Sequence, residues 1–457
     1  MIASLPFGPR TIEATLPDRT VVLSNEEPRS LPPVADLDSA VREALAFPRD
    51  HRRIGDLVTP SASVAIAFDD ATVPFHGPIR GVAILAVLDE LDAAGVSRKN
   101  VTLICANSLH RKFRSEELAR LIGEDLAREF GARLICHDAE DRESLVDLGT
   151  TPGGYPVELH RLAVESDLTV YVNARYIRGF SGGWKSVCVG LSTYRTIKLH
   201  HTPDGMSMAV HGNRMHAILD EMGAHYEART GRRVFKIDTL AASPSETARV
   251  FAGSVGATRQ AALDTIAAMF PPRRDARPRE PIDVFVYGVP DTSPYAVWAR
   301  SNPILNLVSY GLGYLGGMVE ALGRPGCTVI MATPVPEQWD EVHHPSYREV
   351  WERVLPGMRD PYQIMHVHAD AFATRPDYIE RYRHAFAFHP VHAIMAVYPL
   401  KRLQLVGRVI VAGAEDPAVP RHLGFEATPT VEEAIALAEK THGSGCSLAV
   451  IRQPATL

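Results

Sequence analysis

The sequence has few cysteines, no long apolar run and no surplus of positive charge, and each absence excludes a class of protein. Its five cysteines among 457 residues are scattered and form no Cys-x-x-Cys pair, so neither a disulfide framework nor a zinc ribbon is expected. No apolar segment approaches the roughly 18 residues of a membrane span, and the N-terminus lacks the pattern of a signal peptide. The net charge of −6 argues against a nucleic-acid-binding face. We therefore expect a soluble cytoplasmic protein with no nucleic-acid or membrane partner.

The composition is that of a folded protein, and the length of the chain indicates two domains. Apolar residues make up 46% and charged residues 22% of the chain, as in ordinary globular proteins. A chain of this length exceeds one ordinary core, so two domains are expected. The proline-rich, charged stretch 271–281 has no periodicity and reads as a linker. This places an N-terminal domain at 1–270 and a C-terminal domain at 282–457.

Short apolar runs alternate with helical patterns along both domains. This alternation predicts the α/β fold class, with two α/β domains, mostly parallel sheets and a cleft between them. For the N-terminal domain the patterns predict a hairpin at 11–24, strands at 63–70, 101–108, 132–138 and 168–174, and helices at 36–47, 77–95 and 115–123. For the C-terminal domain they predict strands at 281–290, 327–334, 393–398 and 408–413, and helices near 297–322, 346–354, 376–386 and 430–440.

Polar side chains follow three of the predicted strands. Ligands of parallel α/β sheets bind beyond the carboxyl ends of the strands, so these residues are candidates for one site. Asp70 and Thr72 suit a ribose, a metal or a substrate hydroxyl, and equally a helix cap and turn. His110 suits a general base, although a histidine with only a structural role is the commoner case.

The stretch 173–201 concentrates glycines, hydroxyls, one lysine and two histidines. It is not a phosphate loop, because Trp184 separates Lys185 from the preceding glycine. Lys185 is then a nucleophile, a phosphate partner or a covalent cofactor anchor, or else an ordinary surface lysine. Two other patterns are weaker evidence for a binding site. GLGYLGG at 311–317 falls in a predicted helix, and the C-terminal histidines lack the spacing of a zinc site.

Three segments together resemble the nickel-dependent lactate racemase family: FDDAT at 68–72, ANSLHR at 106–111, and RYIRGFSGGWK at 175–185 with His201 downstream. The resemblance implies a nickel-pincer nucleotide (nickel pyridinium-3,5-bisthiocarboxylic acid mononucleotide) linked covalently to Lys185, with His201 as a nickel ligand. It also implies, as partners, the enzymes that make and load this cofactor. The other cofactor contacts that it implies are Asp70, Thr72, Ser181, Gly182 and Gly183.

The reaction implied by the resemblance starts with His110, which removes the hydroxyl proton of a 2-hydroxy acid. A hydride leaves the α-carbon for the cofactor and returns to the opposite face. Arg175 and Tyr176 stand where the family has a second base, and Ala296 and Ala299 stand where it has glutamine and lysine. Because guanidinium stays protonated, Arg175 cannot simply replace a base.

The resemblance, with these departures, thus implies a cofactor-binding N-terminal domain and a racemase or epimerase of a small 2-hydroxy acid, not lactate itself. Two alternatives remain: an oxidoreductase that transfers hydride with the same cofactor, and a non-catalytic cofactor-binding relative. The expected catalytic residues are His110, Arg175 and Tyr176, and the expected substrate-binding residues are Arg178, Tyr295 and Arg300.

Overall fold

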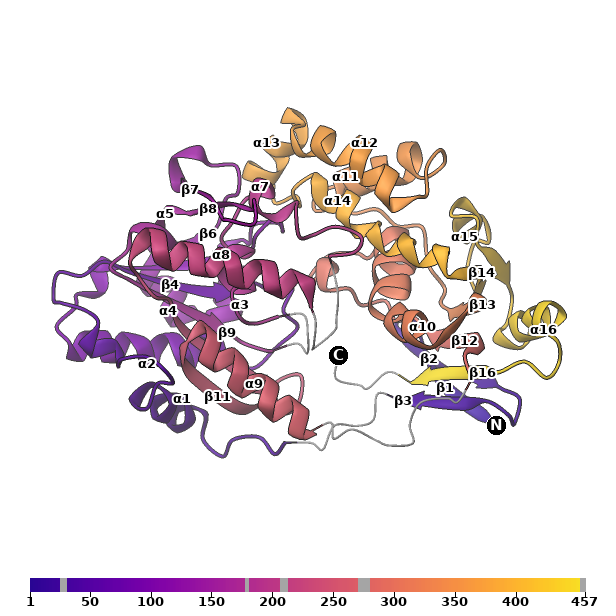
Figure 1. Ribbon diagram of the computed structural model, residues 1–457, viewed down its shortest axis with the longest axis horizontal. Helices are drawn as coiled ribbons and strands as arrows, with labels where there is room; N and C mark the ends of the chain where they lie inside the picture. Colours follow the sequence, from indigo (N-terminus) through magenta and orange to yellow (C-terminus); the bar gives the residue numbers. More distant parts are fainter. Residues whose placement is uncertain (25–30, 177–180, 206–212, 270–279, 453–457) are drawn as a thin grey trace. The chain divides into compact units, whose positions relative to one another are not determined.

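The computed structural model describes residues 1–24, 31–176, 181–205, 213–269 and 280–452. The chain divides into two compact units (Figure 1). The central unit comprises Pro28–Pro271 together with Arg381–Phe388. The terminal unit comprises Met1–Glu27, Pro272–Glu380 and His389–Leu457.

The central unit is built on a six-stranded sheet whose inner strands are parallel. The order of its strands is β11 (Thr247–Ser254), β10 (Phe235–Ala241), β9 (Leu168–Asn173), β4 (Val64–Asp69), β5 (Val101–Ala106) and β6 (Leu134–Cys136). Only the edge pair β10–β11 is antiparallel. Every residue of β4 is buried, as expected for a strand covered on both faces by helices. A separate antiparallel pair, β7 (Leu145–Thr150) and β8 (Pro156–His160), completes the strands described in this unit.

Helices cover this sheet, and most begin where the sequence has a polar cap or a break. In α1, for example, the Asp36 side chain accepts the backbone N–H of Ser39, which satisfies one of the free donors at the helix start. The helices of the central unit are α1 (Leu37–Ala46), α2 (Ile79–Ala93), α3 (Ser115–Ile122), α4 (Glu124–Phe130), α5 (Arg161–Glu165), α6 (Lys185–Cys188), α7 (Tyr194–Ile197), α8 (Arg214–Thr230) and α9 (Val255–Met269).

The terminal unit has its own six-stranded sheet, in which every pair is parallel. The order is β15 (Glu426–Thr428), β14 (Val406–Ala412), β13 (Gly323–Ala332), β12 (Ile282–Gly288), β16 (Leu448–Arg452) and β3 (Val21–Ser24). Figure 1 shows β3, from the start of the chain, beside β16, from its end. The hairpin β1 (Ile2–Phe7) and β2 (Arg10–Thr15) packs into the same apolar core through Leu5, Phe7 and Ala14.

The remaining helices lie mainly in the terminal unit, and α13 spans its boundary with the central unit. None of the described helices is long and apolar enough to cross a membrane. The remaining helices include the π-helical segment η6 (Ile304–Tyr314), α10 (Gly316–Leu322), α11 (Pro345–Glu349), α12 (Pro361–Ala373), α13 (Pro376–His384), α14 (Val391–Ala396), α15 (Ala418–His422) and α16 (Val431–His442).

The α/β fold class is confirmed, and two predicted elements are wrong. The stretch 393–398 is not a strand, because α14 covers most of it; a buried apolar run of six residues suits either state. The hairpin predicted at 11–24 is also wrong. The hairpin turns earlier, at Gly8 with φ 56°, and β3 pairs instead with β16.

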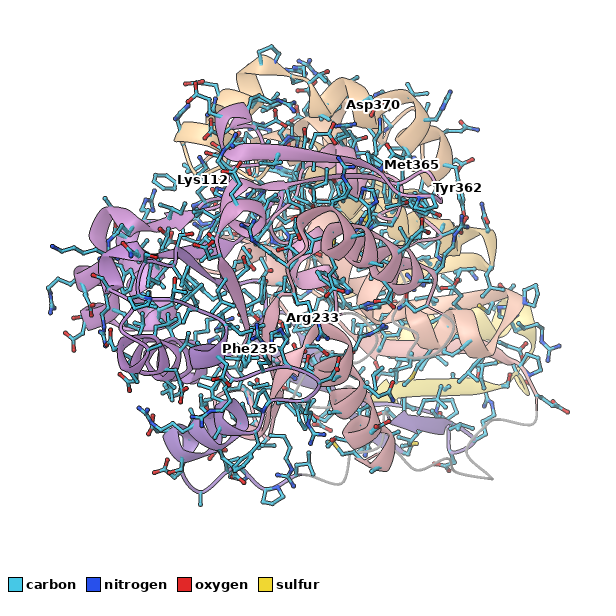
Figure 2. All side chains as sticks on the ribbon, turned by 60° about the vertical axis from the view of Figure 1, so that its left-hand side comes forward. Lys112, Arg233, Phe235, Tyr362, Met365 and Asp370 are labelled. Carbon is cyan, nitrogen blue, oxygen red and sulfur yellow. The ribbon has the colours of Figure 1, made fainter. Side chains whose placement is uncertain are left out.

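The two units differ from the domain boundaries expected from the sequence. Residues 1–27 join the terminal unit, because β3 extends its sheet and β1 lies against β12. Arg381–Phe388 joins the central unit. Lys112, labelled in Figure 2, shows one reason, since its ammonium pairs with Asp138 at 2.7 Å and donates to the Arg383 carbonyl at 2.9 Å. The predicted linker at 271–281 lies almost entirely outside the described residues.

Candidate active site

The carboxyl ends of β5, β4 and β9 meet at one edge of the central sheet, because these three strands are parallel neighbours with β4 in the middle. This edge carries the polar residues that the sequence singled out after each strand. Asp69 links two of the ends directly, since its Oδ2 accepts the backbone N–H of Ala174 at 2.9 Å. The sheet therefore brings the predicted strand-end residues to a common edge.

Asp70 and His110 form a hydrogen-bonded pair at this edge. The Nδ1 atom of His110 lies 2.8 Å from Oδ2 of Asp70, and the side chains are 20% and 3% exposed. Thr72 also donates to Asp70, through its backbone N–H and its hydroxyl. Burial raises the pKa of Asp70, but the bonds from His110 and Thr72 outweigh it and hold the pKa below its usual value. An ionised Asp70 accepts Nδ1–H of His110, which leaves Nε2 as the nitrogen able to take a proton.

Arg80 organises the loop that carries Asp70 and Thr72. Its buried guanidinium donates to an Asp69 carboxylate oxygen at 2.8 Å and to four backbone carbonyls between residues 69 and 75. Burial raises the pKa of Asp69, and the charge of Arg80 opposes that rise. Arg80 is not among the site residues predicted from the sequence. Its position as the one charged residue in the apolar stretch 79–88 could have indicated a buried charge.

The turn that carries His110 is tied both to the Lys185 segment and to Arg381–Phe388. Ser108, in the left-handed region at φ 53°, donates its N–H to the Gly190 carbonyl at 2.9 Å. Its own carbonyl accepts the Tyr382 hydroxyl at 3.2 Å. The ring of Phe388 lies 5.7 Å from that of His110. These contacts fix the position of the His110 backbone relative to α6.

Lys185 is the first residue of α6 and is partly buried. Burial lowers the pKa of its ammonium to about 7, so an appreciable fraction is neutral amine at neutral pH. A neutral amine is a nucleophile. Lys185 therefore differs from a fully solvated surface lysine in its burial and in its lowered pKa. The preceding residue, Trp184, is buried with its ring 5.7 Å from Tyr226.

His200 and His201 lie next to each other with their Nδ1 atoms 2.8 Å apart. His200 is completely buried, and its Nε2 has no hydrogen-bond partner among the described residues. Burial, together with the nearby charge of Lys185, lowers the pKa of His200 to about 3. His201 is only partly buried. The two imidazoles therefore differ in environment although they are adjacent in sequence.

Lys236, on β10, is a buried lysine that sequence analysis missed. It is 0% exposed and donates to the hydroxyl of Ser186, the residue after Lys185. Its ammonium lies 4.1 Å from the centre of the Tyr171 ring and 3.6 Å from Asp238 Oδ1. Burial lowers the pKa of Lys236, and Asp238 opposes that shift. The sequence gives no sign that Lys236 is buried. Lys236 and Asp238 alternate with apolar residues, a pattern typical of a strand with one exposed face.

The two glycines before Lys185 serve the packing of this segment. Gly182 and Gly183 have φ angles of 81° and 57°, which favour glycine. A Cβ on Gly182 would lie 2.0 Å from the Tyr176 ring, and one on Gly183 would lie 2.7 Å from the Arg259 side chain. Ser181 donates to the Arg175 carbonyl at 3.3 Å. These three expected cofactor contacts thus have local structural roles.

Arg175 and Tyr176 differ sharply in environment. Arg175 is partly buried and donates to the Pro74 carbonyl at 3.1 Å; burial lowers its pKa, but a guanidinium still stays protonated. Tyr176 lies in an apolar cluster with Leu240 and Phe251, and burial raises its pKa to about 12. That position suits packing better than proton transfer. Arg178, expected to bind substrate, lies outside the described residues.

The other two expected substrate residues belong to the terminal unit. The Tyr295 carbonyl accepts His344 Nε2 at 2.8 Å, and its ring lies edge-on to His392 at 4.5 Å. Arg300 lines a pocket of about 500 Å³ with Trp298 and four further residues. The described residues contain no group of three or more His, Cys, Asp or Glu side chains able to hold a metal ion.

Part of the chain is similar in sequence to known proteins. A family model described as the lactate racemase N-terminal domain matches residues 7–211. Lactate racemase of Thermoanaerobacterium thermosaccharolyticum is 26% identical over 259 residues, which cover 54% of this chain and 58% of that protein. Lactate racemase of Lactiplantibacillus plantarum is 25% identical over 269 residues, which cover 57% and 62%. The match therefore spans less than two thirds of either relative.

Solved structures share the fold over nearly the whole chain. The lactate racemase apoprotein of Thermoanaerobacterium thermosaccharolyticum superimposes with a TM-score of 0.69 at 19% identity, covering 99% of this chain and 98% of that one. A protein from Thermotoga maritima superimposes with a TM-score of 0.56 at 14% identity, covering 91% and 98%. At these identities the structural matches support the fold alone.

Proposed function

Because the chain is a divergent member of the lactate racemase family, we propose that it is a racemase or epimerase of a 2-hydroxy acid other than lactate, dependent on a nickel-pincer nucleotide. One observation carries the proposal. Lys185, a partly buried lysine with a pKa of about 7, lies on a segment hydrogen-bonded through Gly190 to the turn of the Asp70–His110 pair. The segment that carries the proposed covalent anchor is therefore bonded to the turn that carries the proposed base.

The residues present fit such a cofactor. Three buried polar atoms near the site have no hydrogen-bond partner among the described residues: Asn107 Oδ1, Asn173 Nδ2 and His200 Nε2. Buried polar atoms are rarely left unpaired, so a polar ligand is expected to satisfy them. Lys185 would hold the group covalently and His201 would bind its metal, since imidazole suits nickel. When bound, the group supplies an acceptor for the hydride.

His110 would take the hydroxyl proton of the substrate. Asp70 fixes His110 Nδ1 as a donor, so Nε2 accepts the proton and later returns it. Thr72 and the Arg80 loop hold Asp70 in place. Asp70 and Thr72 thus serve the base, and their expected cofactor contacts remain a proposal.

Arg175 is the proposed partner of the substrate carboxylate, because a guanidinium can bind a carboxylate with two parallel hydrogen bonds. It cannot supply the second base. Val73 also stands where the family pattern has an arginine, and Ala296 and Ala299 stand where it has glutamine and lysine. These replacements favour a substrate that differs from lactate.

A second candidate is an oxidoreductase that passes hydride between two acids with the same cofactor. It is favoured by the presence of a single histidine base, His110, with arginine at the second position. A substrate carrying deuterium on the α-carbon separates the two candidates. Deuterium that returns to the same carbon with inverted configuration supports the isomerase, and deuterium that appears in a second acid supports the oxidoreductase.

The proposal is tested first by loading the protein. The chain is produced together with the enzymes that make the cofactor, and its intact mass, its Lys185 peptide and its nickel content are measured. An adduct on Lys185 with one nickel per chain is expected. Lys185→Ala should abolish the adduct, whereas Lys198→Ala, a control in the same segment, should keep it. An unmodified Lys185 without nickel would contradict the proposal.

A further inference from the structure

His200 has contacts that the packing of the fold alone does not explain. It is 0% exposed, yet one of its two ring nitrogens has no partner among the described residues. The other nitrogen, Nδ1, lies 2.8 Å from Nδ1 of His201. The rings are 4.8 Å apart at 64°, a perpendicular arrangement that allows one nitrogen to donate to the other.

A hydrogen bond between two Nδ1 atoms needs one proton and one lone pair, so it forces the two neutral rings into opposite tautomers. If His201 donates, its Nε2 has the lone pair and His200 carries its own proton on Nε2. If His200 donates, the assignments reverse. Only an imidazole with a lone pair can bind a metal through Nε2. The position of this single proton therefore decides which ring can be the ligand.

We propose that His200 is a positioning residue for His201: its Nδ1 accepts the Nδ1–H of His201, and its own Nε2–H donates to an anionic acceptor on the group bound at Lys185. The metal role of His201 in this statement rests on the proposed function. Metal-binding histidines characteristically donate their second nitrogen to a fixed acceptor, which sets the tautomer and orients the ring. His200 supplies that acceptor from the adjacent residue.

Both tautomers leave Nε2 of His200 without a partner among the described residues, so the direction follows from the lone pair that the metal role of His201 needs, and the bound group has to satisfy the N–H of His200. A buried N–H without an acceptor is rare in a folded protein. His200 lies within electrostatic reach of Lys185, the proposed attachment point, so an anionic acceptor on the bound group would satisfy this N–H. The same contact would place His200 against the bound group while His201 binds its metal.

The first test uses the apoprotein and needs no cofactor. Long-range proton–nitrogen NMR spectra of the imidazoles show which ring nitrogen carries the proton. We expect the proton of His201 on Nδ1 and that of His200 on Nε2. In His200→Asn, whose side-chain oxygen replaces the Nδ1 acceptor, His201 should keep its tautomer; in His200→Leu it should lose this preference. The reverse tautomers in the wild type, or no change with leucine, would overturn the proposal.

The second test uses the loaded protein and follows nickel loss to a chelator. Removing such a supporting partner costs on the order of 10- to 100-fold in metal affinity, so His200→Leu should lose nickel faster by about that factor. His200→Asn should lie near the wild type, which separates lost support from lost folding. Equal rates for leucine and the wild type would overturn the proposal. A wild-type Lys185 without an adduct would instead contradict the proposed function, and the apoprotein tautomers would still decide the role of His200.

Discussion

Replacing Arg80 by methionine should destabilise the central unit severely. Arg80 is 1% exposed at its side chain and pairs with Asp69, which is 5% exposed. Methionine has a similar length and keeps the apolar contacts of the stem, but it removes the charge and every donor. The change therefore leaves a buried carboxylate without its counter-ion and four carbonyls without their donor.

Two estimates of the cost agree. Removing one partner of a buried ion pair costs about 3–5 kcal/mol. Counted separately, the five hydrogen bonds of Arg80 contribute roughly 0.5–1.5 kcal/mol each, which spans the same range. By contrast Arg42, which also pairs with two carboxylates at 2.7 Å but is 47% exposed, should cost at most about 1 kcal/mol when changed to methionine.

Hydrogen exchange measured by mass spectrometry reports on this unit by itself, because peptides from β4 and α2 can be followed individually. At about 1.4 kcal/mol per tenfold, the protection of these peptides should fall roughly a hundredfold to a few thousandfold in Arg80→Met. The double variant Asp69→Asn/Arg80→Met should recover part of the loss, because no uncompensated charge remains. A loss below tenfold in the single variant, or no recovery in the double, would refute the reasoning.

Three further outcomes follow from the same structure. Because burial lowers the pKa of Lys185 to about 7, against about 10.4 for an ordinary lysine, its acetylation rate, followed by peptide mass spectrometry, should level off above pH 8; a rate still rising to pH 10 would contradict this. Asp70→Asn should lower the turnover of a loaded, active enzyme by about 100-fold or more, because His110 loses its fixed tautomer; an unchanged kcat would exclude this role. Gly223→Ala would place a Cβ 2.1 Å from the Trp184 ring and should cost about 1–3 kcal/mol. Gly256→Ala, in open space in the first turn of α9, should stabilise by at most about 0.5–1 kcal/mol, the gain for a helix interior. Thermal unfolding compares the two variants.

Local patterns in the sequence predicted individual strands and helices, but not the pairing of strands that are far apart in the chain. Mainly apolar runs such as 63–70 and 168–174 contain β4 and β9, and their polar ends lie at the candidate site. The run at 393–398 failed because burial on all sides removes the periodicity that separates a helix from a strand. The pairing of β3 with β16 joins opposite ends of the chain, and no local pattern encodes such a contact.

The residues of the candidate site could be proposed from the sequence where their residue type suggests a chemical role, but not where only their contacts suggest one. Lys185 and His110 stood out by their position after strands or glycines. Arg80, His200 and Lys236 did not, because their importance comes from burial and from partners such as Asp69 and Ser186. A buried charge is recognisable only once the surrounding side chains are placed.

The segment Arg381–Phe388 has a consequence for how the protein is made. The central unit is otherwise complete at Pro271, yet the Tyr382 hydroxyl that braces the Ser108 turn belongs to this later segment. During synthesis, at roughly 5–20 residues per second, the central unit must wait on the order of ten seconds for that brace. The terminal unit waits longer, because β3 lies near the start of the chain and its partner β16 is the last of the described strands to leave the ribosome. The edge that carries the candidate site is thus among the last parts of its unit to mature, so a truncated chain that ends before Tyr382 would fold the sheet without finishing the turn that carries His110.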